Sequence, residues 1–292
     1  MPQAVLVTCN RWPELSDSDR LYADALAARG VGVGAAPWNG AQAPFAGADL
    51  VVLRSNWDYH YTPAAFQAWL DGLARPGVAL FNPPDLVRWN LDKRYLLELA
   101  ARGVPIPRTY VVANVDASPA QLLAAAGWRR AVLKPAIGAS GHQVRLIAAL
   151  TDAWPDEPTA ARPLLLQEYL PEVASAGELS CVFFAGVYSH TFCRRPQSGE
   201  FRVNSQFAGA VVRAAPEPAV IAQARSVLAL LPRVPLYARV DGVVRAGVFV
   251  LMELELNEPS LRLDLDPPAA GRFADATLAL LDVQRGEDAA AR

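Results

Sequence analysis

Cysteine is scarce in this sequence: Cys9, Cys181 and Cys193 are the only three among 292 residues. Three cysteines cannot all pair with one another, and their spacings match no metal-binding motif. A disulfide-based scaffold and a cysteine-ligated zinc site are therefore excluded. The first ten residues lack the basic start and apolar core of a secretory signal. We expect a cytoplasmic protein.

Blocks of charge of one sign are absent as well. The net charge is −2 and the charged residues are scattered along the chain, which argues against a nucleic acid or a membrane surface as partner. No apolar run reaches the roughly 20 residues that a transmembrane helix needs. The expected partner is a small molecule, and self-association into a homodimer stays open.

Lysine is the scarcest of the charged residues. Of 27 basic side chains only Lys93 and Lys134 are lysines, and the rest are arginines. These counts indicate a coding bias that favours arginine wherever either residue will serve, so a lysine can mark a position where arginine does not function. One such position is a narrow phosphate pocket, which a compact ammonium can enter and a planar guanidinium cannot. Chance survival is the alternative, and composition alone does not decide between the two.

The first 88 residues alternate apolar strand-like runs with helical segments. Strands are expected at 4–8, 31–38, 50–54 and 78–81, and helices at 20–29 and 63–73. This alternation is typical of a parallel sheet covered by helices. It predicts an N-terminal α/β lobe at residues 1–88.

The rest of the chain is richer in strands. Helices are expected at 85–102, 119–126, 218–231 and 270–281, and strands at 109–112, 131–134, 143–147, 164–169, 178–184, 187–192, 209–213, 237–244 and 248–255. We expect a helix and a central lobe at 89–170 and a strand-rich lobe at 171–292. The predicted fold class is α/β with α+β lobes.

A glycine-rich turn follows the second lysine, in Lys134-Pro-Ala-Ile-Gly-Ala-Ser-Gly141. Backbone N–H groups in such a turn can converge on phosphate oxygens, and glycine allows the close approach. The segment is not a Walker A loop, because no Gly-Lys-Ser/Thr opens a helix. An ordinary hairpin with glycines at positive φ is the alternative.

Acidic and amide side chains gather on two predicted strands near the C-terminus. Strand alternation places Glu253, Glu255 and Asn257 on one face, and a hairpin can bring Asp241 opposite them. Hard oxygen ligands of this kind suit Mg²⁺. A solvated polar strand face is the alternative, but the absence of alternating lysine or arginine favours a metal.

Taken in order, these motifs and Gln167-Glu-Tyr-Leu170 resemble the ATP-grasp superfamily of ligases from about Asn90 to Pro259. The resemblance implies an ATP-grasp fold with an N-terminal parallel α/β lobe, a central lid lobe and a C-terminal antiparallel-sheet lobe. It also implies ATP and Mg²⁺, two ions in all, as cofactors. The implied nucleotide contacts are Lys93 and Lys134 with the phosphates, the turn Gly138, Ser140 and Gly141 over the β- and γ-phosphates, the hinge Gln167, Glu168, Tyr169 and Leu170 with adenine (Glu168 taking the exocyclic amine), and Glu178 with the ribose. The implied metal ligands are Asp241, Glu255 and Asn257, while Glu253 matches no family ligand and is expected beside them.

The segment from Arg194 to Asn204 is similar to the omega loop of glutathione-synthetase-like and RimK-type members of the superfamily. This similarity implies that Arg194 and Arg202 face the transferred phosphate, and that Arg239 stabilises the reacting centre. One departure is visible, because Asn257-Glu-Pro-Ser260 replaces the usual Asn-x-x-Pro-Gly. The loop after the metal ligands, and its substrate contacts, are therefore in doubt.

The resemblance implies a ligase in which a substrate carboxylate attacks the γ-phosphate and an amine then displaces phosphate from the acyl phosphate. The segments around Arg54 and Lys93 look most like D-cycloserine-synthetase-type enzymes, which close the ring of O-ureido-D-serine. Arg54, Trp57 and Tyr59 are the candidate contacts to an amino-acid-like substrate, although the two aromatics can instead pack between lobes. A ligase that joins two amino acids and a non-catalytic ATP sensor are the alternatives.

Overall fold

The computed structural model describes residues 2–73, 78–114, 116–148, 154, 158–207 and 209–290. The elements of the N-terminal lobe are β1 (Gln3–Thr8), α1 (Asp17–Ala27), β2 (Gly32–Pro37), α2 (Ala43–Ala46), β3 (Leu50–Leu53), η1 (Tyr59–Tyr61), α3 (Pro63–Leu73) and β4 (Ala79–Phe81). The four strands form a parallel sheet in the order β2-β1-β3-β4. The prediction of a parallel α/β lobe is confirmed.

Alternate residues of the central strands enter two different cores. Ala4 and Leu6 of β1 face one core, together with Tyr22 and Leu26 of α1. Val5 and Val7 face the other core, which contains side chains of α3 and of the next helix. Because both faces of the sheet are covered, its strands are apolar throughout, as buried parallel strands are.

The predicted helix at 85–102 is two helices, α4 (Pro84–Leu91) and α5 (Tyr95–Ala101). The break falls at Lys93, whose backbone N–H donates to the Ala136 carbonyl at 2.8 Å instead of to a helical partner. Asp92 and Ile137 form a β-bridge at the same place. The helical pattern continued across the break, so sequence periodicity missed it, and the break brings Lys93 to the turn after Lys134.

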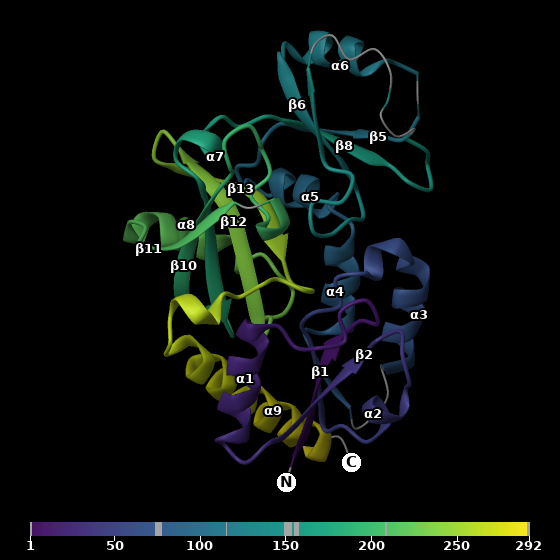
Figure 1. The fold of residues 1–292 in the computed structure, drawn as a ribbon, viewed down its shortest axis with the longest axis vertical. Coiled ribbons are helices and arrows are strands. Elements are labelled where there is room, and N and C mark those ends of the chain that lie inside the picture. The colour runs from purple at the N-terminus through teal and green to yellow at the C-terminus, as the bar shows by residue number, and fades with distance from the viewer. Residues whose placement is uncertain are drawn as a thin grey trace.

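The central lobe contains β5 (Thr109–Val112), α6 (Pro119–Ala126), β6 (Arg130–Pro135), β7 (Arg145–Ala148) and β8 (Leu164–Glu168). Its strands form an antiparallel sheet in the order β5-β8-β6-β7. In Figure 1 this lobe stands apart at the top of the molecule. The strand expected from residue 143 begins at Arg145, after the glycine-rich turn.

The C-terminal part contains α7 (Glu172–Ser175), β9 (Glu178–Phe184), β10 (Val187–Arg195), η2 (Ser205–Phe207), β11 (Ala210–Ala214), α8 (Pro218–Leu228), β12 (Tyr237–Arg245), β13 (Val248–Glu255), η3 (Leu263–Leu265) and α9 (Ala269–Ala290). The five strands form an antiparallel sheet in the order β11-β10-β9-β12-β13. None of the helices that the structure describes is long and apolar enough to cross a membrane.

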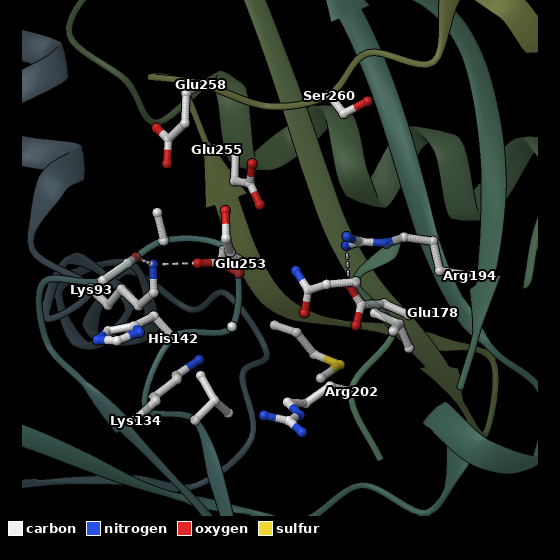
Figure 2. A pocket seen from close by; sticks show the side chains of 18 of the residues that line it. Lys93, Lys134, His142, Glu178, Arg194, Arg202, Glu253, Glu255, Glu258 and Ser260 are labelled. Atoms are coloured by element: carbon white, nitrogen blue, oxygen red, sulfur yellow. Dashed lines mark hydrogen bonds and ion pairs between the residues drawn. The ribbon is translucent and has the colours of Figure 1, made fainter. Parts of the chain in front are cut away.

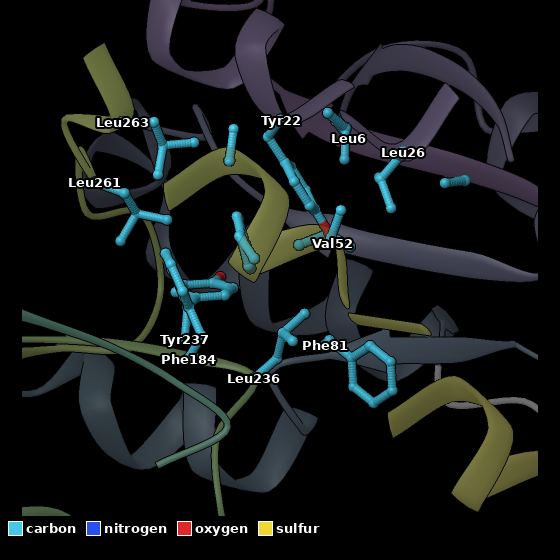
Figure 3. Close-up of a cluster of buried hydrophobic side chains, with 14 of the residues drawn as sticks. Leu6, Tyr22, Leu26, Val52, Phe81, Phe184, Leu236, Tyr237, Leu261 and Leu263 are labelled. Atoms are coloured by element: carbon cyan, nitrogen blue, oxygen red, sulfur yellow. The ribbon is translucent and has the colours of Figure 1, made fainter. Parts of the chain in front are cut away.

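One hydrophobic core joins the N-terminal lobe to the C-terminal sheet (Figure 3). Helix α9 returns to the first lobe, where Phe273 stacks on Tyr22 at 3.8 Å between ring centroids. The hydroxyl of Tyr22 lies 2.7 Å from that of Thr277 in the same helix. The N-terminal lobe is therefore packed firmly against the C-terminal sheet, which fixes one wall of the site.

Candidate active site at the junction of the three lobes

A cavity of about 640 Å³ lies where the three lobes meet (Figure 2). This volume is in the range of pockets that hold small molecules or nucleotides. The predicted site residues that line it are Trp57, Tyr59, Lys93, Lys134, Gly138, Ser140, Gly141, Gln167, Glu168, Tyr169, Leu170, Glu178, Arg194, Arg202, Arg239 and Glu255. Asp241, Asn257 and Arg54 do not line it. The structure thus brings residues more than 190 positions apart in the sequence to one place.

The two lysines lie in different electrostatic settings. The Lys93 ammonium is 2.5 Å from a Glu253 carboxylate oxygen and donates to the Gly138 carbonyl at 2.9 Å. The Lys134 side chain is 8% exposed and makes no hydrogen bond or ion pair within the described residues. Burial lowers the pKa of Lys134, whereas for Lys93 the effect of burial is outweighed by Glu253 and the pKa is raised. Of the two lysines, Lys134 is therefore the one without an anionic partner among the described residues.

The glycine-rich turn packs against the segment that contains η2. Ser140 has φ +54° and Gly141 has φ +67°, a region that side chains with a Cβ rarely adopt. A Cβ at Gly141 would lie 3.0 Å from the Asn204 amide oxygen and from the Phe207 ring. The Gln206 side chain donates to the Ser140 carbonyl. The turn is thus held over the cavity and has no room for a larger residue at position 141.

The predicted adenine hinge consists of the last two residues of β8 and the two residues that follow it. The Gln167 side chain is buried and donates to the Thr109 hydroxyl at 3.0 Å, and the Arg130 guanidinium lies over the Tyr169 ring at 4.4 Å. The Glu168 carboxylate is 3.4 Å from Arg108 and 3.3 Å from Arg245. The backbone N–H of Leu170 has no partner among the described residues. A free N–H beside an apolar wall suits the edge of a heterocyclic base, whereas the contact of Glu168 with the exocyclic amine stays a prediction.

Three carboxylates meet on the paired strands β12 and β13. Oxygen atoms of Asp241, Glu253 and Glu255 lie within 4.8 Å of one another. The antiparallel register places Asp241 opposite Glu253 and Arg239 opposite Glu255. Such a set of hard oxygen donors, close together and partly buried, fits Mg²⁺. The structure therefore gathers Asp241 and Glu255 together with Glu253, which strand alternation had placed on the same face but which matches no metal ligand of the resembled superfamily.

Two buried arginines balance these carboxylates. Arg239 contacts Asp241 at 2.8 Å and also pairs with Glu255. Arg194 contacts Asp241 at 2.7 Å and also pairs with Glu178. Burial raises the pKa of Glu178 despite the opposing charge of Arg194. The Glu178 carboxylate is paired with Arg194. Its predicted contact with a ribose therefore requires that this ion pair break, or that the carboxylate bind Arg194 and the ribose hydroxyls together.

The two carboxylates of β13 differ in their affinity for protons. Burial alone would raise the pKa of Glu253, but Lys93 and Lys134 lower it to about 2. Burial raises the pKa of Glu255 to about 7 even though Arg239 opposes the shift, and the neighbouring carboxylates contribute to it. A divalent cation beside Glu255 would favour its charged form. The positive charges near the cluster therefore compensate Glu253 more fully than Glu255.

Arg202 lies on the opposite side of the cavity from this cluster, in the predicted omega loop. It pairs with Glu200 at 2.8 Å, and its guanidinium lies 3.6 Å from the centroid of the Phe207 ring. Its side chain is 26% exposed, so its contact with Glu200 is open to solvent and can be exchanged for a phosphate. Arg202 is therefore available to a ligand, whereas Arg194 and Arg239 are already held by carboxylates.

Two predicted residues hold the structure around the cavity instead of lining it. Arg54 is 1% exposed, pairs with Asp19 at 2.8 Å and donates to the Pro259 carbonyl at 2.7 Å. Its guanidinium is therefore not placed to contact a substrate carboxylate, which departs from expectation. The Asn257 amide is also buried, and its oxygen accepts a hydrogen bond from Asn56 at 2.9 Å. That Asn257 holds a metal stays a prediction.

Several cavity residues were not singled out from the sequence as ligands. They belong to the N-terminal lobe or to the loop after β13: Arg11, Trp12, His60, Tyr61, Glu258, Ser260 and Arg262. Burial raises the pKa of Glu258 to about 8, and the neighbouring carboxylate of Glu255 adds to the shift. One signal was available for Glu258, because it falls in the Asn257-Glu-Pro-Ser260 segment where the chain departs from the superfamily pattern.

Sequence comparisons relate the chain to one kind of biosynthetic enzyme. A family model described as "D-cycloserine synthetase DcsG, N-terminal domain" matches residues 4–82. The cycloserine biosynthesis protein DcsG of Streptomyces lavendulae is 36% identical over 273 residues, which cover 86% of this chain and 90% of that protein.

Solved structures give the same picture. The crystal structure of D-cycloserine synthetase DcsG superposes with a TM-score of 0.81 at 29% identity, covering 96% of this chain and 99% of that one. D-alanine–D-alanine ligase from Bacillus anthracis, complexed with ATP, superposes with a TM-score of 0.67 at 15% identity, covering 99% of this chain and 100% of that one. At this lower identity the likeness concerns the fold alone.

Proposed function

This chain belongs to the D-cycloserine synthetase family of ATP-grasp ligases, and we propose that it closes the ring of a small amino-acid-like acid, O-ureido-D-serine, at the expense of Mg-ATP. It is an ATP-dependent ligase, and the proposal concerns its substrate, its metal ions and the roles of its residues. One observation supports these roles most strongly. A single cavity is lined by Lys134, which has no ion-pair partner among the described residues, by a glycine-rich turn, and by Glu253 and Glu255, two members of the carboxylate cluster completed by Asp241.

The nucleotide is proposed to lie between the central lobe and the C-terminal sheet. Adenine would lie at the hinge, where the N–H of Leu170 has no hydrogen-bond partner in the described part of the chain. The phosphates would extend toward Lys134 and the turn at Gly138–Gly141. The Lys134 ammonium, which has no partner among the residues that the structure describes, and the close approach of the backbone would suit an anion. Lys93 would contact the same phosphates while it stays paired with Glu253.

The metal site fits the donors that the chain supplies. We expect two Mg²⁺ ions, held by Asp241, Glu255 and Asn257. Glu253 lies close to the first two of these residues, and Asn257 lies in the loop after β13. The ions, when bound, would neutralise charge on the phosphates and on the incoming carboxylate. The arginines Arg194 and Arg239 would orient the same carboxylates and keep their negative charges from repelling one another.

The proposed reaction has two steps. A carboxylate oxygen of the substrate attacks the γ-phosphorus of ATP, which releases ADP and gives an acyl phosphate. The ureido nitrogen bonded to oxygen then attacks the acyl carbon, loses its proton and expels phosphate. Water then hydrolyses the bond between this nitrogen and the carbamoyl carbon, and the carbamic acid released breaks down to ammonia and carbon dioxide. Arg202 and Arg239 would stabilise the negative charge that develops on the transferred phosphoryl group and on the acyl oxygen.

The remaining alternative is a ligase that joins two amino acids. D-alanine–D-alanine ligase shares this fold at 15% identity, so the fold alone does not exclude that reaction. The 36% identity to a cycloserine biosynthesis protein favours ring closure. The non-catalytic sensor considered from the sequence does not agree with a family whose members are named as synthetase and ligase.

The test is an assay of purified protein with Mg-ATP and a panel of acids that includes O-ureido-D-serine and single and paired D-amino acids. Ring closure is expected to release ADP, phosphate, ammonia and carbon dioxide, and mass spectrometry should find the cyclic product. A product heavier by a second residue would instead show a dipeptide ligase. Absence of ADP release with every acid would contradict both reactions.

A further inference from the structure

Glu258 is the one carboxylate lining the cavity that has no ion pair within the described part of the chain. The other carboxylates that line the cavity each have a basic partner: Glu168 pairs with Arg108 and Arg245, Glu178 with Arg194, Glu253 with Lys93, and Glu255 with Arg239. Glu258 is half-buried, and a carboxylate that is partly removed from water without a positive partner is unfavourable. A cation supplied by a ligand would remove that penalty.

The main chain around Glu258 is fixed by the N-terminal lobe. The Trp57 indole donates to the Glu258 carbonyl at 3.1 Å, and Arg54 donates to the next carbonyl, that of Pro259, at 2.7 Å. With its backbone held on both of these carbonyls, the Glu258 side chain extends into the cavity beside Glu255 (Figure 2). The position of the carboxylate is therefore built into the fold.

Aromatic side chains of the N-terminal lobe line the cavity next to Glu258. Tyr59 is close enough for its hydroxyl to interact with the Glu258 carboxylate, and Trp57 lies 5.9 Å from Trp12 between ring centroids. Ring faces attract cations. One such contact is already present, because the Arg11 guanidinium lies 5.0 Å from the centroid of the Trp12 ring. A carboxylate beside aromatic rings is a typical environment for an ammonium group.

We propose that Glu258 binds the α-ammonium group of the substrate, so that the enzyme selects α-amino acids over simple carboxylic acids. The inference rests on the proposed ligase function and adds the part of the substrate that it leaves unassigned. The reacting carboxylate would face Glu255 and Arg239, and the ammonium on the neighbouring carbon would reach Glu258. An acid without the ammonium would leave the half-buried Glu258 carboxylate without a positive partner.

The experiment compares O-ureido-D-serine with its deamino counterpart, 3-(ureidooxy)propanoic acid, in a steady-state assay of ADP release. The wild-type enzyme is expected to prefer the amino acid in kcat/KM by about 10- to 100-fold, the range for a charge-assisted hydrogen bond. Glu258→Gln should remove most of that preference and leave the deamino acid nearly unaffected. Glu258→Asp should keep part of it, and Glu217→Gln, at an exposed position that precedes α8, should keep all of it.

Equal losses for both acids in Glu258→Gln would overturn the assignment, as would a change confined to the Mg²⁺ dependence of turnover. If the wild-type enzyme turns over neither acid, the proposed function fails, and calorimetric binding of D-serine against 3-hydroxypropanoate then decides the role of Glu258. A preference for D-serine that Glu258→Gln abolishes would support it. No preference, or a preference that survives the substitution, would refute it.

Discussion

Lys134 shows at the scale of one residue why a lysine persists in a chain that otherwise uses arginine. The residue is 8% exposed and its ammonium has no partner within the described residues, whereas Lys93 is already paired with Glu253. We predict that Lys134→Arg weakens ATP binding by on the order of tenfold, or about 1.4 kcal/mol, although the charge is kept. The planar fork of arginine is wider than a compact ammonium and presents its N–H donors in a fixed arrangement, so it should not reproduce the contacts of the lysine with the phosphates.

Calorimetric titration with Mg-ATP measures this change directly. The matched control is Arg225→Lys, the reverse exchange at an exposed position on α8, which should leave the nucleotide affinity unchanged. An unaltered dissociation constant in Lys134→Arg would show that the site needs only a positive charge, and would remove the argument from lysine scarcity.

Glu255 and Asp241 should respond differently to loss of charge, although both belong to the acid cluster. Glu255 lines the cavity and has one arginine partner, so Glu255→Gln should mainly raise the Mg²⁺ concentration for half-maximal turnover, by about 10- to 100-fold. Asp241 is fully buried and pairs with Arg194 and Arg239. Asp241→Asn should therefore also destabilise the fold, by about 3–5 kcal/mol.

Thermal melting of the two variants separates the effects, since only Asp241→Asn should lower Tm strongly. Turnover measured at increasing Mg²⁺ concentration then gives the concentration for half-maximal rate in each variant, which should rise in Glu255→Gln. Equal losses of Tm would mean that Glu255 is a structural residue like Asp241, and would argue against its contact with the metal ion.

Much of the site could be predicted at the residue scale because its motifs are short and local. Lys134, the glycine-rich turn and the pair Asp241 and Glu255 were identified from spacing and strand alternation, and the fold brings them together. Arg54 could not be placed, because nothing local reveals that Asp19, 35 positions earlier, pairs with its guanidinium. Partners far apart in sequence decide whether a charged side chain faces a ligand or supports a loop.

At the scale of elements, residues 54–57, which follow β3, hold the loop after β13 in place by hydrogen bonds. Arg54 donates to Pro259, Asn56 to Asn257, and Trp57 to the Glu258 carbonyl. The Tyr237 hydroxyl lies 2.7 Å from the carbonyls of both Leu53 and Asn257. Three successive residues of the loop are thus positioned by the N-terminal lobe.

This arrangement predicts the effect of Arg54 substitutions. Arg54→Lys keeps a charge near Asp19 but cannot reach both Asp19 and Pro259 in the same geometry. We expect the apparent KM for the acid to rise by about tenfold or more while the KM for ATP changes little, because the loop faces the acid and not the adenine hinge. Arg54→Ala should in addition lower stability by about 3–5 kcal/mol, since Asp19 would remain buried without its partner.

Steady-state kinetics with each substrate varied in turn gives the two KM values, and thermal melting gives the stability. Arg262→Lys is a useful comparison. Arg262 lines the cavity, its one ion pair within the described residues is with Asp264, and its substitution should leave the hydrogen bonds between residues 54–57 and the loop intact. Equal changes in both KM values after Arg54→Lys would show a general distortion of the site instead of a displaced loop.

Element boundaries were the part of the fold that periodicity described least well. Residues 85–102 have a continuous helical pattern, yet the structure stops the helix before Lys93 and starts a second one at Tyr95. A tertiary contact causes the break, because the Lys93 N–H bonds to Ala136 in the central lobe. Local sequence carries no information about that partner, so the break could not be predicted even though its functional residue was.

For the molecule as a whole, the lobes were predictable because each has its own pattern of strands, while their packing was not. Helix α9 belongs in sequence to the strand-rich third of the chain but packs on α1 of the first lobe. Strand and helix periodicity describes which face of an element is buried, not which partner covers it. The cavity arises from that packing, since it is lined by residues of all three lobes.

The pH dependence of stability is a property of the whole molecule that these buried groups predict. Burial lowers the pKa of His60 to about 4 and lowers that of His190 as well, against about 6.5 in an unfolded chain. Between pH 6.5 and 4 the unfolded state therefore takes up protons that the folded state does not, so both histidines reduce stability as the pH falls. Glu255 and Glu258, whose pKa values are raised to about 7 and 8, act in the opposite sense over the range from 8 to 4.5.

Because these contributions oppose each other, the prediction concerns the difference between wild type and His60→Gln, in which only one group is removed. The Tm of His60→Gln relative to wild type should rise as the pH is lowered from 7.5 to 5, by about 2–4 °C for each kcal/mol regained. His190→Gln should lose the contact of its ring with the Leu261 carbonyl, now 2.8 Å, and so start from a lower Tm at pH 7.5 with the same trend. A difference that does not vary with pH would show that His60 is protonated as readily in the folded protein as in the unfolded chain.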